Sequence, residues 1–269
     1  MRRLWSVVAV IAALCSISLA AQQPGQQGQQ GRQGAPPAGP GGRGGPAGAP
    51  ATGRSQAPFD LSGYWVSLVT DDWRYRMLTP PKGNADYLPV NAEARRVMGE
   101  WDPAKDEAAG EACRAYGAGG VMRLPGRLHI TWENDNVLKM DLDAGTQTRR
   151  FQFGPTAAAT TGEPTWQGTS SARWMFPAGR GRGPATTAQL VVTTNRLRPG
   201  YLRKNGIPYG ANAVITEYFV RLVDEGQEYL AVTTMVDDPQ YLALPYVKTY
   251  QYKKQSDATG WNPSPCVAR

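Results

Sequence analysis

The sequence contains only one histidine, His129, and three cysteines among its 269 residues. Neither Cys113 nor Cys266 has a second cysteine or histidine at metal-ligand spacing, so no zinc site is expected. Glycine-rich phosphate cradles between a strand and a helix are also missing. The stretch at residues 168–172, GTSSA, departs from a nucleophile elbow and lies in a β setting, where that motif does not work. We therefore predict no metal and no cofactor.

Long hydrophobic runs are scarce as well, and the only one lies at the N-terminus. Arg2 and Arg3 precede an apolar run from Leu4 to Leu14, and small residues follow up to Ala20. This order predicts a signal peptide over residues 1–20. A membrane-spanning helix needs about 20 apolar residues, which is more than this run offers. We expect a periplasmic or secreted protein with no transmembrane anchor.

Apolar side chains larger than alanine are nearly missing from residues 21–56, which are rich in Gln, Gly and Pro. Such a segment cannot offset the entropy of ordering itself, so we predict a disordered linker. Residues 1–56 hold five arginines and no lysine or acid; without them the chain's net charge of +7 becomes +2 for residues 57–269. The basic balance thus belongs to a tail, and no nucleic-acid partner is expected.

The remaining residues, 57–269, are long enough for a single domain with its own core. They keep Cys113 and Cys266, and an exported chain meets an oxidising compartment. We predict that these two cysteines form a disulfide. Two free buried thiols are the alternative.

Alternating apolar and polar residues, rich in Val, Thr, Tyr and Trp, recur along this domain and predict strands. Turn residues separate the segments, which are Tyr64–Thr70, Arg127–Glu133, Val137–Leu142, Thr148–Phe153, Thr165–Phe176, Gln189–Asn195, Ala213–Val223, Glu228–Val236 and Tyr246–Lys253. We predict an all-β fold, mainly an antiparallel barrel or sandwich of calycin type. Asn91 as N-cap and Asp102-Pro103 as a stop predict one helix, and Pro103 can begin a second, so one or two short helices are expected near residues 91–110.

The stretch DLSGYW carries Gly63-x-Trp65, which is similar to the short signature on the first strand of lipocalins and related calycin barrels. That resemblance implies a tryptophan at the barrel floor beneath a basic residue of the last strand, here Lys253 or Lys254, with the ammonium over the indole. The blocks GYW, PGRLHITW, WQG, LRKNGIP and DDPQY also resemble a family of uncharacterised secreted bacterial proteins rich in β-structure. This second resemblance implies a single exported β-rich domain and assigns no activity.

His129 lies on a segment whose register can be predicted. If Trp132 pairs with Leu138 across a three-residue loop, His129 faces Asp141 on the polar side of the hairpin. An imidazole oriented by a carboxylate is half of a general-base unit, which makes His129 and Asp141 the candidate catalytic residues. An ordinary cross-strand polar pair on a solvated face is the alternative.

Other residues point to ligand binding. Glu217 lies on an otherwise apolar face, where a carboxylate needs a partner, and Arg149, Arg203 or Arg221 can supply one. The segment RPGYLRKNGIPYG gathers charged and aromatic side chains on a loop, which suits a planar or acidic organic ligand or merely covers the barrel end. The ligand-binding candidates are Glu217, Arg149, Arg203, Tyr201, Tyr209 and Trp166; Trp166 and Trp174 are expected on one face of one strand, where core packing also explains them.

These observations favour an exported binding protein that holds a small apolar or aromatic molecule inside its barrel. A cofactor-free lyase, isomerase or hydrolase that uses His129 and Asp141 is the first alternative. A structural or interaction protein of the cell envelope is the second, and an exposed apolar patch on one barrel wall would favour it. The sequence names no protein partner.

Overall fold

The computed structural model describes residues 51–70, 72–155, 162–177 and 188–269. The expected signal peptide and the expected linker up to residue 50 lie outside the described residues. Residues 51–56, which the sequence placed in the linker, form a turn against the barrel: the Gly53 N–H donates to Asn136 Oδ1 at 2.8 Å, and Trp174 Nε1 donates to the Gly53 carbonyl at 2.7 Å.

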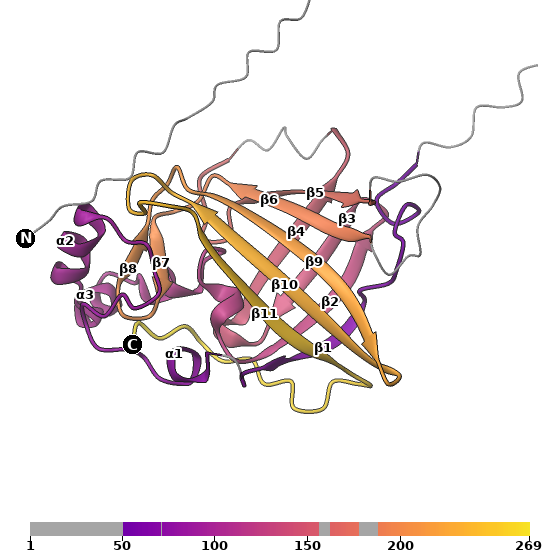
Figure 1. Ribbon diagram of the computed structural model, residues 1–269, viewed down its shortest axis with the longest axis horizontal. Helices are drawn as coiled ribbons and strands as arrows, with labels where there is room; N and C mark the ends of the chain where they lie inside the picture. The colour runs from indigo at the N-terminus through magenta and orange to yellow at the C-terminus, as the bar shows by residue number, and fades with distance from the viewer. Residues whose placement is uncertain (1–50, 71, 156–161, 178–187) are drawn as a thin grey trace, which may run out of the picture. The chain divides into compact units, whose positions relative to one another are not determined.

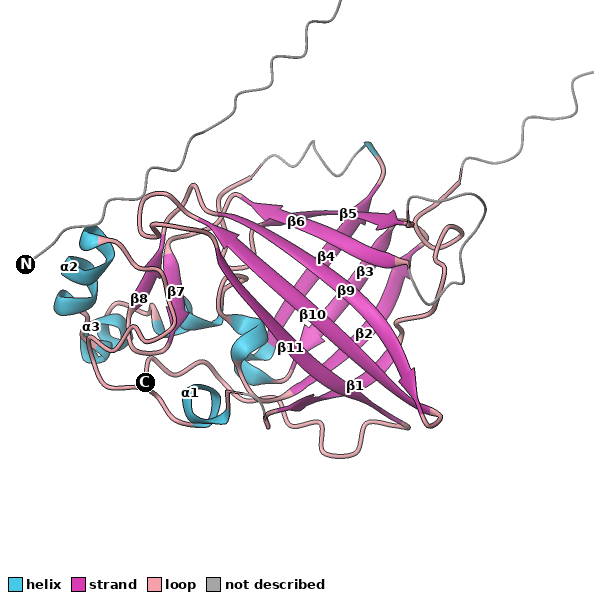
Figure 2. Cartoon of the chain, viewed as in Figure 1, coloured by secondary structure: helices cyan, strands magenta, loops and turns pink. Residues whose placement is uncertain are grey.

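The centre of the fold is a closed β-barrel, as the alternation predicted (Figures 1 and 2). Its strands follow the order β1-β11-β10-β9-β6-β5-β4-β3-β2, and β2 pairs again with β1. The strands are β1 Gly63–Leu68, β2 Arg127–Asn134, β3 Val137–Leu142, β4 Gln147–Phe153, β5 Thr169–Met175, β6 Gln189–Asn195, β9 Val214–Asp224, β10 Gln227–Asp237 and β11 Tyr246–Gln255. Each of them coincides, within a few residues, with one predicted segment.

All neighbouring barrel strands pair antiparallel except β4 and β5, which run parallel. A parallel pair needs a long connection, and residues 154–168 supply it. Strand β5 begins later than expected because Gly168 adopts a left-handed conformation, φ +60°. A Cβ on Gly168 would lie 2.3 Å from the Asn195 carbonyl oxygen, so the close approach of β6 requires glycine. Trp166 therefore does not share a strand with Trp174.

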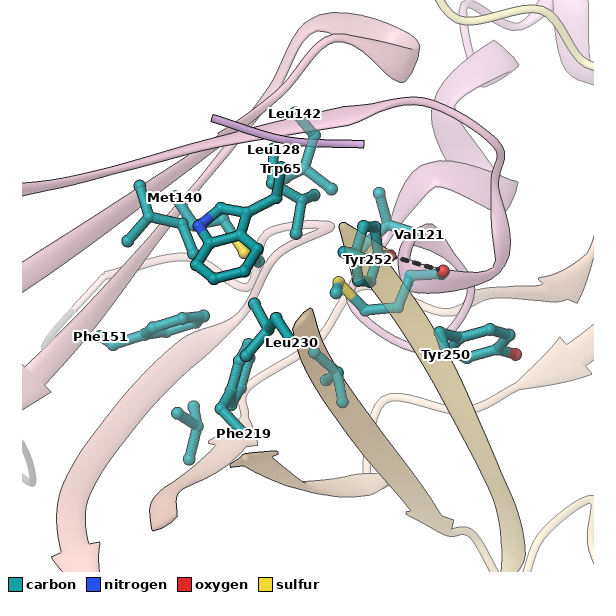
Figure 3. Close-up of a cluster of buried hydrophobic side chains, with 14 of the residues drawn as sticks. Trp65, Val121, Leu128, Met140, Leu142, Phe151, Phe219, Leu230, Tyr250 and Tyr252 are labelled. Carbon is teal, nitrogen blue, oxygen red and sulfur yellow. Dashed lines mark hydrogen bonds between the residues drawn. The ribbon is translucent and has the colours of Figure 1, made fainter. Parts of the chain in front are cut away.

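The apolar face of the barrel wall points inward, and its side chains form one continuous core (Figure 3). Trp65, Phe151, Phe219 and Leu230 gather there with Met140, and the rings of Phe151 and Phe219 lie 5.4 Å apart. The opposite side of each strand points away from the barrel, which is the alternation expected of a barrel with a packed interior.

A basic side chain covers the indole of Trp65, as the calycin resemblance implies. The ammonium of Lys254 lies 4.7 Å from the ring centroid and donates to the Ser62 carbonyl at 2.7 Å. The Trp65 Nε1–H donates to the Leu61 carbonyl at 2.9 Å, so this fully buried indole keeps its hydrogen bond.

The two helices predicted near residues 91–110 are present as α2, Ala92–Glu100, and α3, Pro103–Ala108. Asn91 Oδ1 caps α2 by accepting from the Ala94 N–H at 3.0 Å, and Asp102 caps α3 in the same way on Ala104. A further short helix, α1, covers Trp73–Met77 and was not predicted. No helix among the described residues is long and apolar enough to cross a membrane.

A small hairpin lies beside one end of the barrel, together with α2 and α3 (Figures 1 and 2). Its strands are β7, Gly200–Arg203, and β8, Ile207–Tyr209. The sequence placed this segment in a loop; the structure instead forms two short strands on either side of the Asn205-Gly206 turn. The hairpin and α2 share a second apolar core with the ends of β9 and β10; it includes Met98, Leu202, Ile207, Ile215 and Val236.

The C-terminal segment is fixed to the body of the domain by the predicted disulfide between Cys113 and Cys266, whose Cα atoms lie 5.1 Å apart. Cys113 belongs to a 3₁₀ turn, η1, Ala112–Tyr116. A second 3₁₀ turn, η2, Val121–Arg123, packs against the barrel core, and Tyr252 Oη donates to the Met122 carbonyl at 2.9 Å (Figure 3).

Candidate functional site

A pocket of about 520 Å³ opens beside the barrel, between α1, the loop after it, β7 and β11. Its walls include Trp73, Tyr75, Tyr87, Arg203, Tyr246 and Lys248, and we call it the barrel-end pocket. This volume lies within the range of small-molecule sites, which is about 300–1,000 Å³. Aromatic rings form much of its surface, and basic groups supply most of its charge.

The aromatic walls are held by contacts between segments. The rings of Tyr75 and Tyr87 meet edge to face at 5.8 Å, and Tyr75 Oη donates to Asp86 at 3.1 Å. Hydrogen bonds from Asn84 and Tyr75 lower the pKa of Asp86, and the charges of Arg74 and Arg203 lower it further. Tyr75 is thus held in place as a wall of the pocket, whereas Tyr87 is 84% exposed.

Arg203 supplies the charge deepest in the pocket. The side chain lines the pocket although the residue is only 2% exposed, and its guanidinium lies over the Tyr75 ring at 4.6 Å. Its Nε and Nη1 atoms are buried and have no hydrogen-bond partner among the described residues. The turn after β7 fixes its position, because Asn205 Nδ2 donates to the carbonyls of Pro81 and Asn84 at 3.1 and 2.8 Å.

A second buried guanidinium, that of Arg123, lies behind the wall of the pocket. Arg123 is 3% exposed, and its Nη1 donates to the Tyr75 carbonyl at 2.8 Å. Its Nε and Nη2 atoms lack a partner in the described part of the chain. Burial lowers the pKa of Arg123, and the neighbouring charges of Arg203 and Arg76 lower it further. The described residues thus place two buried guanidinium groups, those of Arg123 and Arg203, at this end of the barrel.

Inside the barrel, the structure brings together Glu217 and Arg149, two of the predicted ligand-binding residues. Arg149 Nη1 donates to Glu217 Oε1 at 2.9 Å, and both side chains are fully buried. Thr194 accepts from the guanidinium at 3.3 Å, and Thr234 donates to the carboxylate at 3.5 Å. Arg149 is thus the partner that Glu217 requires; Arg221 instead binds Glu228. The two charges pair within the packed core, while the buried Arg149 Nε has no hydrogen-bond partner among the described residues.

Tyr201 and Tyr209, from the predicted loop, line a smaller pocket of about 260 Å³ beside α2 and α3. Tyr201 Oη donates to Asp106 at 2.9 Å, and Arg114 donates to the other oxygen of that carboxylate at 2.7 Å. Burial, with the Asp106 carboxylate, raises the pKa of Tyr201, and burial raises that of Tyr209. These residues do not reach the barrel-end pocket; of the predicted loop candidates, only Arg203 lines it.

His129 and Asp141 face each other across β2 and β3 in the predicted register, on the outer side of the barrel. The imidazole stacks on Tyr64, with centroids 4.1 Å apart and planes 3° from parallel, and Trp261 lies 6.2 Å away. Asp141 binds Thr148 Oγ1 at 2.7 Å and the Lys139 ammonium at 2.9 Å. The carboxylate is thus occupied by these two neighbours, and the imidazole is held by rings.

Trp166 lies apart from the other candidates, in the bend before β5, where the guanidinium of Arg198 covers its ring at 4.0 Å. Arg198 also binds Glu111 at 2.6 Å. This stack connects the segment just before β5 with the segment just before β7.

Sequence reasoning missed the aromatic walls of the barrel-end pocket. Tyr75 and Tyr87 are 12 residues apart and Tyr246 lies far along the chain, so no local motif contains all three. The alternation of aromatic and basic residues in DDWRYRM, where Trp73 and Tyr75 lie, was the one local signal.

The described residues hold no cluster of three or more His, Cys, Asp or Glu side chains that suits a metal ion. Comparisons of the chain with protein-family models, with curated proteins and with solved structures yield no match. What the structure offers is the arrangement of the pocket: exposed ring surfaces and a buried guanidinium lie together in one hollow.

Proposed function

We propose that this protein is an exported binding protein that holds a small aromatic or apolar molecule in the barrel-end pocket. The observation that carries the proposal is the combination in one hollow of exposed rings, those of Trp73 and Tyr87, with a buried guanidinium, that of Arg203. Apolar walls with a few placed polar groups are typical of small-molecule sites.

The barrel interior is a weaker candidate for this ligand than the pocket beside it. Trp65, Phe151 and Phe219 belong to one packed cluster there, and the charge of Arg149 is already paired with Glu217. A ligand would have to displace close-packed side chains, which protein interiors resist. The proposal therefore moves the site from the interior to the end of the barrel.

Export is part of the proposal. It is supported by the N-terminal pattern of residues 1–20 and by the disulfide between Cys113 and Cys266, a bond that persists in oxidising compartments. The similarity of several sequence blocks to secreted bacterial β-rich proteins points the same way.

The enzyme alternative has less support. A general base needs an imidazole within hydrogen-bond reach of its orienting carboxylate. The Asp141 carboxylate instead binds Lys139 and Thr148, and the His129 ring stacks on Tyr64. A polar pair on the outer barrel wall accounts for these contacts.

Native mass spectrometry of the full chain, purified without denaturant, tests the proposal. We expect an organic adduct on the wild-type protein and its loss from the Trp73→Ala/Tyr87→Ala variant, whose truncated side chains are 59% and 84% exposed and carry little of the fold. Phe176→Ala is the matched control, since this ring is also exposed but does not line the pocket. An adduct retained equally by all three proteins would place the ligand elsewhere.

A further inference from the structure

We infer that the ligand of the barrel-end pocket carries an acidic group, a carboxylate or another oxyanion, which Arg203 binds beside an aromatic or apolar body. This inference deepens the proposed function and rests on it.

The Arg203 side chain is buried and incompletely hydrogen-bonded. A guanidinium stays protonated in proteins, so the nearly complete burial of Arg203 buries a full charge. Buried charges are normally paired and hydrogen-bonded. Two of the three nitrogens of this guanidinium, Nε and Nη1, have no partner among the described residues. An anion in the pocket supplies the missing charge, and its oxygen atoms match the donor fork of arginine.

The charges around the pocket also favour an anion. Among the described residues that line it, one is acidic, Asp72, and three are basic, Arg74, Arg203 and Lys248. The ammonium of Lys248 lies 3.3 Å from the Asp72 carboxylate, so that acid is already compensated. Asp86 lies near Arg203 but accepts its hydrogen bonds from Tyr75 and Asn84. The described lining residues therefore present an anionic ligand with more basic than acidic groups.

A second buried guanidinium lies behind the wall of the pocket. Arg123 is buried, two of its nitrogens lack a partner in the described ranges, and the charge of Arg203 contributes to lowering its pKa. Like charges that are buried together repel, and a shared counter-ion relieves the repulsion. A ligand oxyanion at Arg203 would act on both groups, because electrostatic interactions reach further in a buried site than in water.

The other side chains that line the pocket determine which apolar body the ligand carries beside its acidic group. Trp73, Tyr87 and Val247 present exposed apolar surface at the pocket rim, and Tyr246 is buried in the wall. Rings in this position bind a planar aromatic body by stacking and by edge contacts. The ligand class is therefore an aromatic acid, or an acid with an apolar body of similar size.

Isothermal titration calorimetry on the full chain tests this assignment with two probes of nearly equal shape, 2-naphthoate and the neutral 2-naphthamide. We expect the acid to bind about tenfold to 100-fold more tightly, as charge-assisted hydrogen bonds allow. Titration with 2-naphthyl phosphate shows whether the site prefers a carboxylate or a phosphate.

Substitutions distinguish the contribution of the Arg203 charge to affinity from that of the aromatic side chains that line the pocket. Arg203→Met should bring the affinities for acid and amide together, and Arg203→Lys, which keeps the charge but loses the fork, should restore part of the difference. Tyr87→Ala should weaken both probes alike. Arg198→Met is the control: it removes a neighbouring arginine that stacks on Trp166 outside the pocket, and it should leave both affinities unchanged.

The outcomes distinguish this inference from the proposed function. If acid and amide bind the wild-type protein equally and Tyr87→Ala weakens both, the pocket is a binding site but its ligand is not an acid. If none of the probes binds, both the inference and the proposed function are wrong. Since a buried position is changed in Arg203→Met, circular dichroism must first show a folded variant, and Arg203→Lys gives the same test with less change in structure.

Discussion

The guanidinium of Arg149 and the carboxylate of Glu217 lie opposite each other inside the barrel, joined by two hydrogen bonds and shielded completely from solvent. They belong to β4 and β9, which are not neighbours in the barrel wall, so the pair connects two sides of the interior. Two charges within an apolar core make the stability of the barrel depend on their remaining together.

We expect Glu217→Gln to lower the free energy of unfolding by about 3–5 kcal/mol, because it leaves the Arg149 charge buried without a partner. The double variant Arg149→Met/Glu217→Leu, which removes both charges and keeps the volume, should cost far less. Urea denaturation of the three proteins measures these differences. Equal losses in the single and the double variant would mean that packing, and not charge pairing, determines the cost.

The disulfide is expected to contribute about 4–5 kcal/mol to stability by closing a very long loop in the unfolded chain; its cysteines are 153 residues apart. The free energy of unfolding of Cys113→Ser/Cys266→Ser, measured by denaturant titration, should be lower by this amount. The wild-type protein titrated with a reductant present should show a similar loss. A double variant as stable as the oxidised protein would contradict a stabilising role for the bond.

Stability should fall steeply above pH 10. Burial raises the pKa of Tyr250 well above its usual value, and burial also raises the pKa values of Tyr201, Tyr209 and Tyr252. Unfolded tyrosines ionise near pH 10, whereas these folded ones keep their protons, so the stabilisation is complete below about pH 10 and is lost as pH rises further. Urea unfolding between pH 8 and 11 measures the decline, and Tyr252→Phe should make it shallower.

The absorbance of tyrosinate at 295 nm gives an independent check of that prediction. A fraction of the twelve tyrosines should ionise only when the protein unfolds. Ionisation of all of them near pH 10 in a protein that remains folded would contradict it.

Arg203→Met should leave the stability of the ligand-free protein unchanged or raise it by up to about 2 kcal/mol, because it removes a buried and incompletely bonded charge. The same change should abolish the preference for acids. Thermal unfolding with and without 2-naphthoate measures both effects in one experiment. A strong loss of stability in the ligand-free variant would indicate that Arg203 stabilises the folded protein.

His129→Ala should lower the free energy of unfolding by only about 1 kcal/mol, through loss of the stack on Tyr64. Ligand affinity at the barrel-end pocket should be unchanged, since His129 does not line it. The enzyme alternative instead requires that this substitution abolish turnover and leave the melting temperature nearly unchanged. Calorimetric titration of the variant with 2-naphthoate, beside its unfolding curve, checks both expectations.

The barrel was predictable from sequence because its strands alternate between a packed interior and an outer face, a local pattern with period two. The register of His129 with Asp141 followed from the same pattern and a short turn. Helix α2 was predictable because Asn91 provides a local N-cap signal. These features need no knowledge of distant residues.

The short helix α1, the strand β8 and the barrel-end pocket could not be predicted from local sequence patterns. Helix α1 has five residues, too few for a periodic signal, and β8 contains Pro208, which argues against a strand in sequence. The partner of Glu217 was one of three arginines, and only the closed barrel identifies Arg149. The barrel-end pocket brings together Tyr75, Arg203 and Tyr246 by long-range packing, which no local pattern encodes.

A crystal structure of the full chain grown with 2-naphthoate would show directly whether the pocket holds an acid. We expect electron density for the acid in the barrel-end pocket, with its carboxylate at Arg203 and its rings against Tyr87. Density for the acid inside the barrel or against His129, with the barrel-end pocket unaltered, would contradict this expectation.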